Sequence, residues 1–361
     1  MSESQLIRDW IRPEIQALSA YHVANAHGLI KLDAMENPYT WSQDLRQQWL
    51  QQLQHVDVNR YPDPQARVLA EQLRSVMDIP DEMALLLGNG SDEIIQMLAM
   101  AVSGTGRSIL SVEPGFVMYS MIALWCGMEY RGVPLKADDF SLDMPALRKA
   151  IAETRPALIF LACPNNPTGN QFAEQDILEI LKLAPGLVVV DEAYAPFADT
   201  SFMPHLGRFD NLLVMRTVSK LGLAGLRLGL LAGSKAWLEQ IDKVRMPYNI
   251  NVLTQETARF ALQHHQVLDE QTANIRQQRQ KMFSALAQLP GIQVYSSQAN
   301  FLLVRVDGGA EALFDALLKG GVLVKKLHGS HPLLQECLRF TVGKAEENAQ
   351  LLQLVEDFCR G

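Results

Sequence analysis

Hydrophobic positions in the middle of the chain form short runs separated by amphipathic stretches. These runs lie at 84–87, 108–112, 157–162, 187–191, 212–215 and 228–233. They lack the alternation expected of a strand with one face in water, so each is predicted to be a strand buried on both faces. Strands that alternate with helices favour a mostly parallel sheet with crossover helices. We therefore expect a large α/β domain.

The C-terminal part of the chain has a different pattern. Residues 234–290 are predicted to be helical and long enough to link two domains. After Pro290-Gly291 there are strand-like runs at 301–306, 321–325 and 338–342, a helical stretch at 310–319 and a terminal helix. This pattern predicts a smaller α+β unit, completed by an otherwise irregular N-terminal segment. The expected domains are 41–275 for the large one, and 1–40 with 276–361 for the small one and the N-terminal arm.

Composition narrows the function classes. The chain has 361 residues, 48% of them hydrophobic and 20% charged, which is ordinary globular usage. A net charge of −8 argues against a nucleic-acid or anionic-membrane surface. We see no signal peptide and no run long enough to span a membrane. The four cysteines are scattered without zinc-ligand spacing, which favours reduced thiols in the cytoplasm.

The first candidate site is the loop 88–93, Gly-Asn-Gly-Ser-Asp-Glu, between a predicted strand and a helix. Glycines allow a tight turn, and a helix N-terminus offers free N–H groups and a positive dipole end. Gly90, Ser91 and Asp92 are therefore candidates for a phosphate site. A simple capped turn accounts for the same residues equally well.

Three further loops follow predicted strands, at the sheet edge where α/β proteins bind ligands. The loop 163–169 holds Asn166 between two prolines. Asp191 ends an apolar strand, where an ionised carboxylate needs a cation or a proton-bearing ligand. Lys220 lies among glycine and apolar residues, where desolvation favours a neutral, nucleophilic amine. Taken singly, residues such as Lys220 and Arg227 are more often solvated surface charges, and it is their position on the same sheet edge as the other loops that favours a site.

In combination these loops resemble those of the fold-type I pyridoxal-phosphate-dependent aminotransferases, over nearly the whole chain. The segments that carry the resemblance are Pro-Asn-Asn-Pro-Thr-Gly at 164–169, Asp-Glu-Ala-Tyr at 191–194 and the Ser-Lys to Arg stretch at 219–227. Within this group the chain resembles the histidinol-phosphate aminotransferase family. That closer likeness rests on Ala20-Tyr21, Glu36–Tyr39, Asn59–Asp63, Asn300-Phe301 and Leu338–Gly343.

The resemblance implies a cofactor, pyridoxal 5′-phosphate, and three catalytic residues. Lys220 would bind the cofactor covalently and move a proton during the reaction. Asp191 would pair with the ring nitrogen. Tyr194, together with Asn166, would hydrogen-bond the phenolic oxygen of the ring. Phe116 would stack on the ring, where many relatives have Tyr.

The resemblance also implies a phosphate site built by two subunits. The groups expected around the cofactor phosphate in one chain are Gly90, Ser91, Asp92, Thr217, Ser219 and Arg227. Tyr61 would reach the phosphate bound by the neighbouring subunit, so a homodimer with shared active sites is expected. The spacing between Lys220 and Arg227 is one residue shorter than in some relatives.

On the substrate side, the resemblance implies that Arg339 binds both the glutamate carboxylate and the phosphate of histidinol phosphate. Tyr21, Asn37 and Asn300 are expected to help. A second basic group is needed, and some relatives have Arg where this chain has Lys325 followed by another lysine. The implied reaction is L-histidinol phosphate + 2-oxoglutarate ⇌ imidazole-acetol phosphate + L-glutamate, in histidine biosynthesis.

Three alternatives stay open at this point. An aromatic amino-acid aminotransferase and a decarboxylase of a phosphorylated amino acid share these cofactor motifs. A non-catalytic cofactor-binding module is disfavoured because Lys220, Asp191 and Tyr194 are all present. His328 and His331 suggest a metal pair, but no Cys or carboxylate completes it, so no metal is expected. The chain has no GxSxG or GxGxxG motif that would favour a hydrolase or a dinucleotide site.

Overall fold

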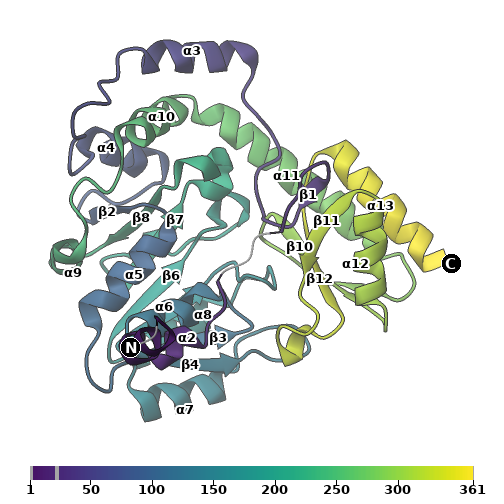
Figure 1. The fold of residues 1–361 in the computed structure, drawn as a ribbon, viewed down its shortest axis with the longest axis horizontal. Coiled ribbons are helices and arrows are strands. Elements are labelled where there is room, and N and C mark those ends of the chain that lie inside the picture. Colours follow the sequence, from purple (N-terminus) through teal and green to yellow (C-terminus); the bar gives the residue numbers. More distant parts are fainter. Residues whose placement is uncertain (1–2, 21–23, 361) are drawn as a thin grey trace.

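The computed structural model describes residues 3–20 and 24–360. Its elements form two groups, each built around one sheet, and the long helix α11 (His265–Leu286) runs from one group to the other (Figure 1). The predicted fold class, a mostly parallel α/β sheet with a smaller α+β unit, is confirmed.

The first group contains a seven-stranded sheet in the order β2-β8-β7-β6-β5-β3-β4. Its strands are β2 (Ala84–Gly88), β3 (Ser108–Glu113), β4 (Glu129–Pro134), β5 (Leu158–Ala162), β6 (Leu187–Asp191), β7 (Leu212–Thr217) and β8 (Gly229–Gly233). Strand β8 runs antiparallel to both of its neighbours, and the other pairs are parallel. All six predicted strands are confirmed.

The central strands are buried on both faces, as their unbroken apolar runs predicted. In β5, Ile159 and Leu161 pack into one hydrophobic cluster, and Leu158 and Phe160 pack into the other. Both clusters lie between the sheet and its covering helices. These helices are α4 (Arg67–Val76), α5 (Ser91–Val102), α6 (Met118–Trp125), α7 (Met144–Thr154), α8 (Glu174–Leu183), α9 (Lys235–Ile241) and α10 (Val252–Gln263). Helix α3 (Gln43–Leu53) packs on α10 instead, where Trp49 donates to the Thr257 hydroxyl at 2.9 Å.

The second group contains a five-stranded sheet in the order β1-β11-β12-β10-β9. Its strands are β1 (Ile30–Leu32), β9 (Ile292–Val294), β10 (Phe301–Val306), β11 (Val322–Lys326) and β12 (Cys337–Thr341), and its helices are α12 (Ala310–Lys319) and α13 (Ala345–Arg360). The N-terminal segment completes this sheet, because β1 pairs with β11.

Several elements differ from the sequence prediction. Residues 1–40 are not wholly irregular, since they include α1 (Glu3–Trp10), α2 (Pro13–Gln16) and β1. Every residue of α1 is exposed, so no buried face marked it in the sequence. Strand β4 was missed because it is a polar edge strand, and β1 and β9 because each has only three residues.

The predicted helix over 234–290 is interrupted. It comprises α9, the short turn η5 (Asp242–Val244), α10 and α11, with an irregular stretch at 245–251 that contains Pro247. Proline removes a backbone donor and disfavours a helical residue before it, which accounts for the break. The expected domain boundary at 275/276 stays a prediction, and it falls inside α11.

Short helical turns occupy several loops near the carboxyl ends of the central strands. They are η1 (Ala195–Phe197), η2 (Met203–His205), η3 (Ser219–Leu223) and η4 (Ala224–Leu226); a further turn, η6 (Pro332–Leu334), precedes β12. The two groups meet where the loop after β5 contacts β12, since the Nη1 atom of Arg339 donates to Oδ1 of Asn166 at 2.6 Å. The candidate site lies at this junction.

Candidate active site

A small cup forms at the N-terminus of α5. Gly90 precedes the helix with a φ of +88°, and a Cβ there would meet the Arg227 guanidinium at 2.7 Å. Gly229 on β8 lies opposite both Gly88 and Thr217, and a Cβ on Gly229 would meet the Ser91 nitrogen at 2.7 Å. Only glycine lets these backbones approach so closely.

Hydroxyl and cationic side chains surround the cup. Thr217 and Ser219 hydrogen-bond each other through their hydroxyls at 2.9 Å, and both are buried. Arg227 lies 3.4 Å from the Asp92 carboxylate on the first turn of α5. The structure therefore brings together all six residues predicted to surround the phosphate within one chain. The Gly90 amide is already bonded to the Gly88 carbonyl at 2.8 Å, so the donors suited to an anion are the first-turn amides of α5, the hydroxyls and the guanidinium.

A buried carboxylate stands at the end of β6. Asp191 is 4% exposed, and its Oδ1 accepts a hydrogen bond from the Ala193 amide at 3.0 Å. Its Oδ2 accepts one from the Tyr119 hydroxyl at 2.6 Å. Burial raises the pKa of Asp191 to about 6, against the lowering effect of these two donors. The sequence indicated that this carboxylate needs a partner but did not identify Tyr119.

The next residue, Glu192, has its own cation. Arg216 on β7 contacts the Glu192 carboxylate at 2.8 Å, and Nη2 of the same guanidinium donates to the Ser201 hydroxyl at 2.8 Å. Glu192 is 2% exposed, so the pairing prevents an isolated buried charge. This ion pair links the ends of β6 and β7, between Asp191 and the cup residue Thr217.

Lys220 lies in the π-helical turn η3, directly after the cup residue Ser219. Its Nζ is 3.4 Å from the Ala34 carbonyl and 5.8 Å from the centre of the Tyr194 ring. Burial lowers the pKa of Lys220 to about 8, and the nearby Arg339 guanidinium adds to the effect. About a tenth of this amine is therefore neutral, and nucleophilic, at pH 7, far more than for an ordinary lysine.

The segment 33–37, which follows β1, connects most of these groups. Its carbonyls accept hydrogen bonds from Arg339 at Asp33 (2.8 Å), from Lys220 at Ala34 (3.4 Å) and from Asn300 at Met35 (2.9 Å). The Tyr194 hydroxyl donates to the Met35 sulfur at 3.0 Å, and Asn37 donates to the Leu221 carbonyl at 3.1 Å. Nothing in the sequence pattern identified these backbone contacts.

The predicted substrate residues Asn300 and Asn37 differ in whether their side-chain amide has a hydrogen-bonding atom still available for a ligand. Asn300 is fully buried, and its Oδ1 has no hydrogen-bond partner among the described residues. Both N–H groups of Asn37 are used, by Leu221 and by Gln271 at 3.0 Å, so Asn37 anchors the chain beside the site. Tyr21 lies outside the described residues.

The register of the second sheet distinguishes two consecutive lysines. Lys325 on β11 lies directly opposite Arg339 on β12, and opposed residues of an antiparallel pair share a face. Lys326 is on the other face, where it pairs with Glu311 at 2.7 Å and lies over the Phe314 ring. Lys325 is therefore the lysine that shares the Arg339 side of the sheet.

Two predicted cofactor residues are aromatic. Phe116 lies in the loop after β3 and contacts the Tyr119 ring edge to face, with 5.5 Å between ring centres. Tyr61 is 80% exposed and stacks on Tyr248 at 4.4 Å. The ring of Tyr61 therefore contacts another surface aromatic ring and not the cup of its own chain. An exposed aromatic pair of this kind is typical of a protein–protein contact.

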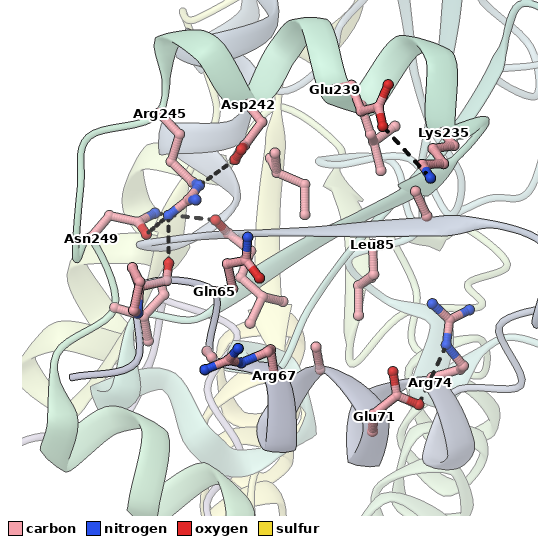
Figure 2. Close-up of a pocket in the computed structure, with 18 residues that line it drawn as sticks. Gln65, Arg67, Glu71, Arg74, Leu85, Lys235, Glu239, Asp242, Arg245 and Asn249 are labelled. Atoms are coloured by element: carbon pink, nitrogen blue, oxygen red, sulfur yellow. Dashed lines mark hydrogen bonds and ion pairs between the residues drawn. The ribbon is translucent and has the colours of Figure 1, made fainter.

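A pocket of 340 Å³ lies elsewhere, beside the edge strand β2 and between α4 and α9 (Figure 2). Three of its basic side chains are already paired within its walls. Arg245 contacts Asp242 at 2.6 Å, Arg74 contacts Glu71 at 3.9 Å and Lys235 contacts Glu239 at 3.8 Å. This pocket contains none of the predicted site residues. The described residues include no cluster suited to a metal ion.

Comparison with known proteins agrees with this geometry. Residues 27–355 match the family model for aminotransferase class I and II. A histidinol-phosphate aminotransferase 2 of Nitrosococcus oceani is 56% identical over 351 residues, 97% of each chain. The chain belongs to the histidinol-phosphate aminotransferase family. Another family member, from Chromobacterium violaceum, is 51% identical over 98% of each chain.

Solved structures of the family share the fold. The histidinol-phosphate aminotransferase of Sinorhizobium meliloti, solved in complex with pyridoxal-5′-phosphate, has a TM-score of 0.84 at 23% identity, with 98% of each chain covered. The enzyme of Clostridium acetobutylicum has a TM-score of 0.83 at 22% identity, covering 92% of this chain and 99% of its own. The fold-type I resemblance seen in the sequence is therefore confirmed.

The lowered pKa of Lys220 leads to a first prediction. Reductive methylation of the cofactor-free protein proceeds through neutral amines, so labelling of Lys220 should reach half of its plateau at about pH 8 and level off above about pH 9. Mass spectrometry of the peptide containing Lys220 measures the extent of labelling at each pH. Exposed lysines such as Lys149 and Lys235 serve as internal references for the reagent. Labelling of Lys220 that still rises steeply above about pH 10, the range of an ordinary lysine, would contradict the lowered pKa.

Proposed function

We propose that this chain is a cytoplasmic, pyridoxal-phosphate-dependent aminotransferase of histidine biosynthesis. Its reaction is L-histidinol phosphate + 2-oxoglutarate ⇌ imidazole-acetol phosphate + L-glutamate. The observation that carries the proposal is the Lys220 amine, which directly follows the cup residue Ser219, lies 5.8 Å from the centre of the Tyr194 ring and has a pKa lowered to about 8. No helix of the described residues has the length and apolar character needed to cross a membrane.

The residues present fit pyridoxal phosphate at both of its charged ends. The cup at Gly90 and Ser91 is closed by Arg227, so it suits a phosphate and excludes a side chain. Asp191 is a buried carboxylate with a raised pKa, suited to sharing a proton with a ring nitrogen. When bound, the cofactor withdraws electrons from the bond that breaks at the substrate α-carbon.

Each side chain then has a separate task. Lys220 binds the cofactor and, once released, takes the proton from the substrate α-carbon and returns it; a pKa of about 8 suits both directions. The Tyr194 phenol, which donates to the Met35 sulfur in this structure, would turn its O–H to the ring oxygen of a bound cofactor. Oδ1 of Asn166 is occupied by Arg339, so Asn166 has its NH₂ group left to donate. Phe116 covers one face of the ring.

The basic groups of the second sheet account for the two substrates. Arg339 is 6% exposed and already held by Asn166 and Asp33, so its planar fork has a fixed orientation toward a carboxylate. Lys325 on the same face adds a second, exposed positive charge, which a phosphate dianion needs more than a carboxylate does. The Oδ1 atom of Asn300 is an acceptor for a substrate donor.

A homodimer with shared active sites completes the proposal. Tyr61 is one of the groups expected to hold the cofactor phosphate, yet it is 80% exposed in a single chain. Its stacking on Tyr248 keeps the ring at the surface. Exposed Met246 and Val58 add apolar area. Pairing of two chains would bury this surface and bring each Tyr61 to the other chain's cup.

The substrate assignment predicts the outcome of a half-reaction. Histidinol phosphate added to the cofactor-loaded protein without any keto acid should convert the cofactor to its amine form, measured by the loss of visible absorbance. Phenylalanine should do so at least tenfold more slowly, because its carboxylate carries one negative charge where histidinol phosphate carries a phosphate dianion, and the proposed contact of that extra charge with Lys325 is worth about 1.5 kcal/mol. Lys220→Ala should abolish the conversion, because it removes both the attachment point and the proton carrier.

Two outcomes would overturn the assignment. Equal rates with phenylalanine would favour an aromatic amino-acid aminotransferase. Release of carbon dioxide from a phosphorylated amino acid would favour a decarboxylase. A threonine-phosphate decarboxylase of Porphyromonas gingivalis is 21% identical to the chain, a similarity that shows the fold alone.

The shared site predicts complementation between two inactive variants. Lys220→Ala and Tyr61→Ala chains, mixed and allowed to exchange subunits, should form hybrids in which one site keeps both native residues. Activity should therefore rise above that of either parent. Tyr295→Ala, which removes a tyrosine ring that follows β9 and packs on Phe140, is the control and should stay active without mixing. Hybrids detected by mass spectrometry without a gain in activity would exclude Tyr61 from the partner's site.

The two basic groups predict different losses. Arg339→Lys keeps the charge but loses the bidentate fork of the guanidinium. The rate of each half-reaction should therefore fall by the equivalent of roughly 1.5–3 kcal/mol, which is the contribution of a hydrogen bond to a charged group. Lys325→Ala should impair histidinol phosphate more than glutamate. Stopped-flow absorbance measures each half-reaction separately. Lys326→Ala, on the opposite face, is the control. Equal losses for both substrates in Lys325→Ala would exclude its phosphate role.

A further inference from the structure

Tyr119 has a buried phenol beside the candidate site. It lies on the first turn of α6, three residues after Phe116, and is 1% exposed. Its ring stacks on Phe160 of β5, with 4.7 Å between ring centres and 8° between planes, and the Phe116 ring meets it edge to face. These rings fix the position of Tyr119 from two sides. A hydroxyl buried among rings is costly unless it finds a partner.

The partner of the Tyr119 hydroxyl is the Asp191 carboxylate. The O–H donates to Oδ2 at 2.6 Å, a length typical of a hydrogen bond to an ionised oxygen. The other oxygen, Oδ1, accepts from the Ala193 amide at 3.0 Å. Both carboxylate oxygens are therefore fixed by donors from different elements, and the side chain cannot rotate without breaking one of the two bonds.

We propose that Tyr119 is a positioning residue that holds the Asp191 carboxylate in the orientation and charge state required by the ring nitrogen of the cofactor. This inference rests on the proposed function, because it assumes that Asp191 faces that nitrogen. Tyr119 itself acts through Asp191. The same short segment thus supplies both Phe116, which covers the ring, and Tyr119, which sets its acidic partner.

The surrounding charges show why a donor is needed at this position. Burial is the largest influence on Asp191 and raises its pKa, and the Asp92 and Glu192 carboxylates raise it further. The Tyr119 hydrogen bond is the largest influence in the opposite direction, followed by the Ala193 amide. Without the phenol, the carboxylate becomes more basic and takes a larger share of the proton that it shares with the ring nitrogen. Burial also raises the pKa of Tyr194, and the Asp191 charge contributes to that rise.

Tyr119→Phe is the direct test, because it keeps the stacked ring and removes only the hydroxyl. We expect kcat to fall about tenfold or more with KM nearly unchanged, since a hydrogen bond to a charged group is lost at the cofactor and not at the substrate. The Kd of pyridoxal phosphate for the cofactor-free protein should rise severalfold. The pH midpoint of the bound cofactor's visible absorbance should move upward, because a less positive ring no longer favours deprotonation nearby.

Tyr130→Phe is the matched control. Tyr130 is a partly buried tyrosine on β4 that packs against the same hydrophobic cluster as Tyr119. Tyr130→Phe likewise removes only a phenol hydroxyl. This variant should leave the Kd, kcat and the absorbance midpoint within about twofold of the wild type, because the Asp191 carboxylate accepts its hydrogen bond from Tyr119 and not from Tyr130. A second comparison uses the Asp191→Asn background. There, adding Tyr119→Phe should cause little further loss, because the two residues act as one unit.

Three results would overturn the proposal. In the first, Tyr119→Phe leaves the Kd, kcat and midpoint unchanged. In the second, Tyr130→Phe causes equal losses, which would indicate a packing effect. In the third, Tyr119→Phe and Asp191→Asn have additive effects. Failure of the proposed function looks different, because the wild-type protein would then bind no pyridoxal phosphate, or would bind it and transfer no amino group from histidinol phosphate.

Discussion

The burial of carboxylates at the end of β6 is the constraint on which the rest of the site depends. Asp191 ends a strand with no exposed residue and Glu192 follows it, and ionised groups there are unstable unless each has its own donors. The fold meets this requirement twice, with the Tyr119 phenol for Asp191 and the Arg216 guanidinium for Glu192. These two contacts place α6 and β7, and with β7 the cup residue Thr217, in fixed relation to the carboxylates.

Much of the fold followed from the sequence because its central strands are continuous apolar runs, a pattern that short buried strands produce and surface loops do not. The missed strands were short or lay at an edge, where side chains such as those of Glu129 and Arg131 face water and the pattern resembles a loop. Clustering of the four loops was also predictable, since parallel strands end at the same sheet edge. Tyr119 was missed because a tyrosine in an apolar helix is indistinguishable from an ordinary core residue until its hydroxyl partner is known.

The register between neighbouring strands determines which side chains share a face, and no single segment of the sequence shows that register. The sequence offered Lys325 and Lys326 without a means to choose between them. Only the antiparallel register of β11 against β12 places Lys325 on the face of Arg339 and leaves Lys326 to Glu311. A shift of one residue would exchange the two lysines, because strand side chains alternate between faces. The register of this sheet is therefore also a determinant of where positive charge lies.

The segment 33–37 has an evolutionary consequence. Surface connections usually tolerate insertions and deletions. Here, successive residues contact Arg339, Lys220, Asn300 and Tyr194 in turn, and β1 fixes the segment at its start. Inserting or deleting a single residue would move the carbonyls of this segment away from the side chains that donate hydrogen bonds to them. The length of this stretch is therefore expected to stay constant among functional homologues, even where its side chains vary, because most of its contacts are made by backbone carbonyls.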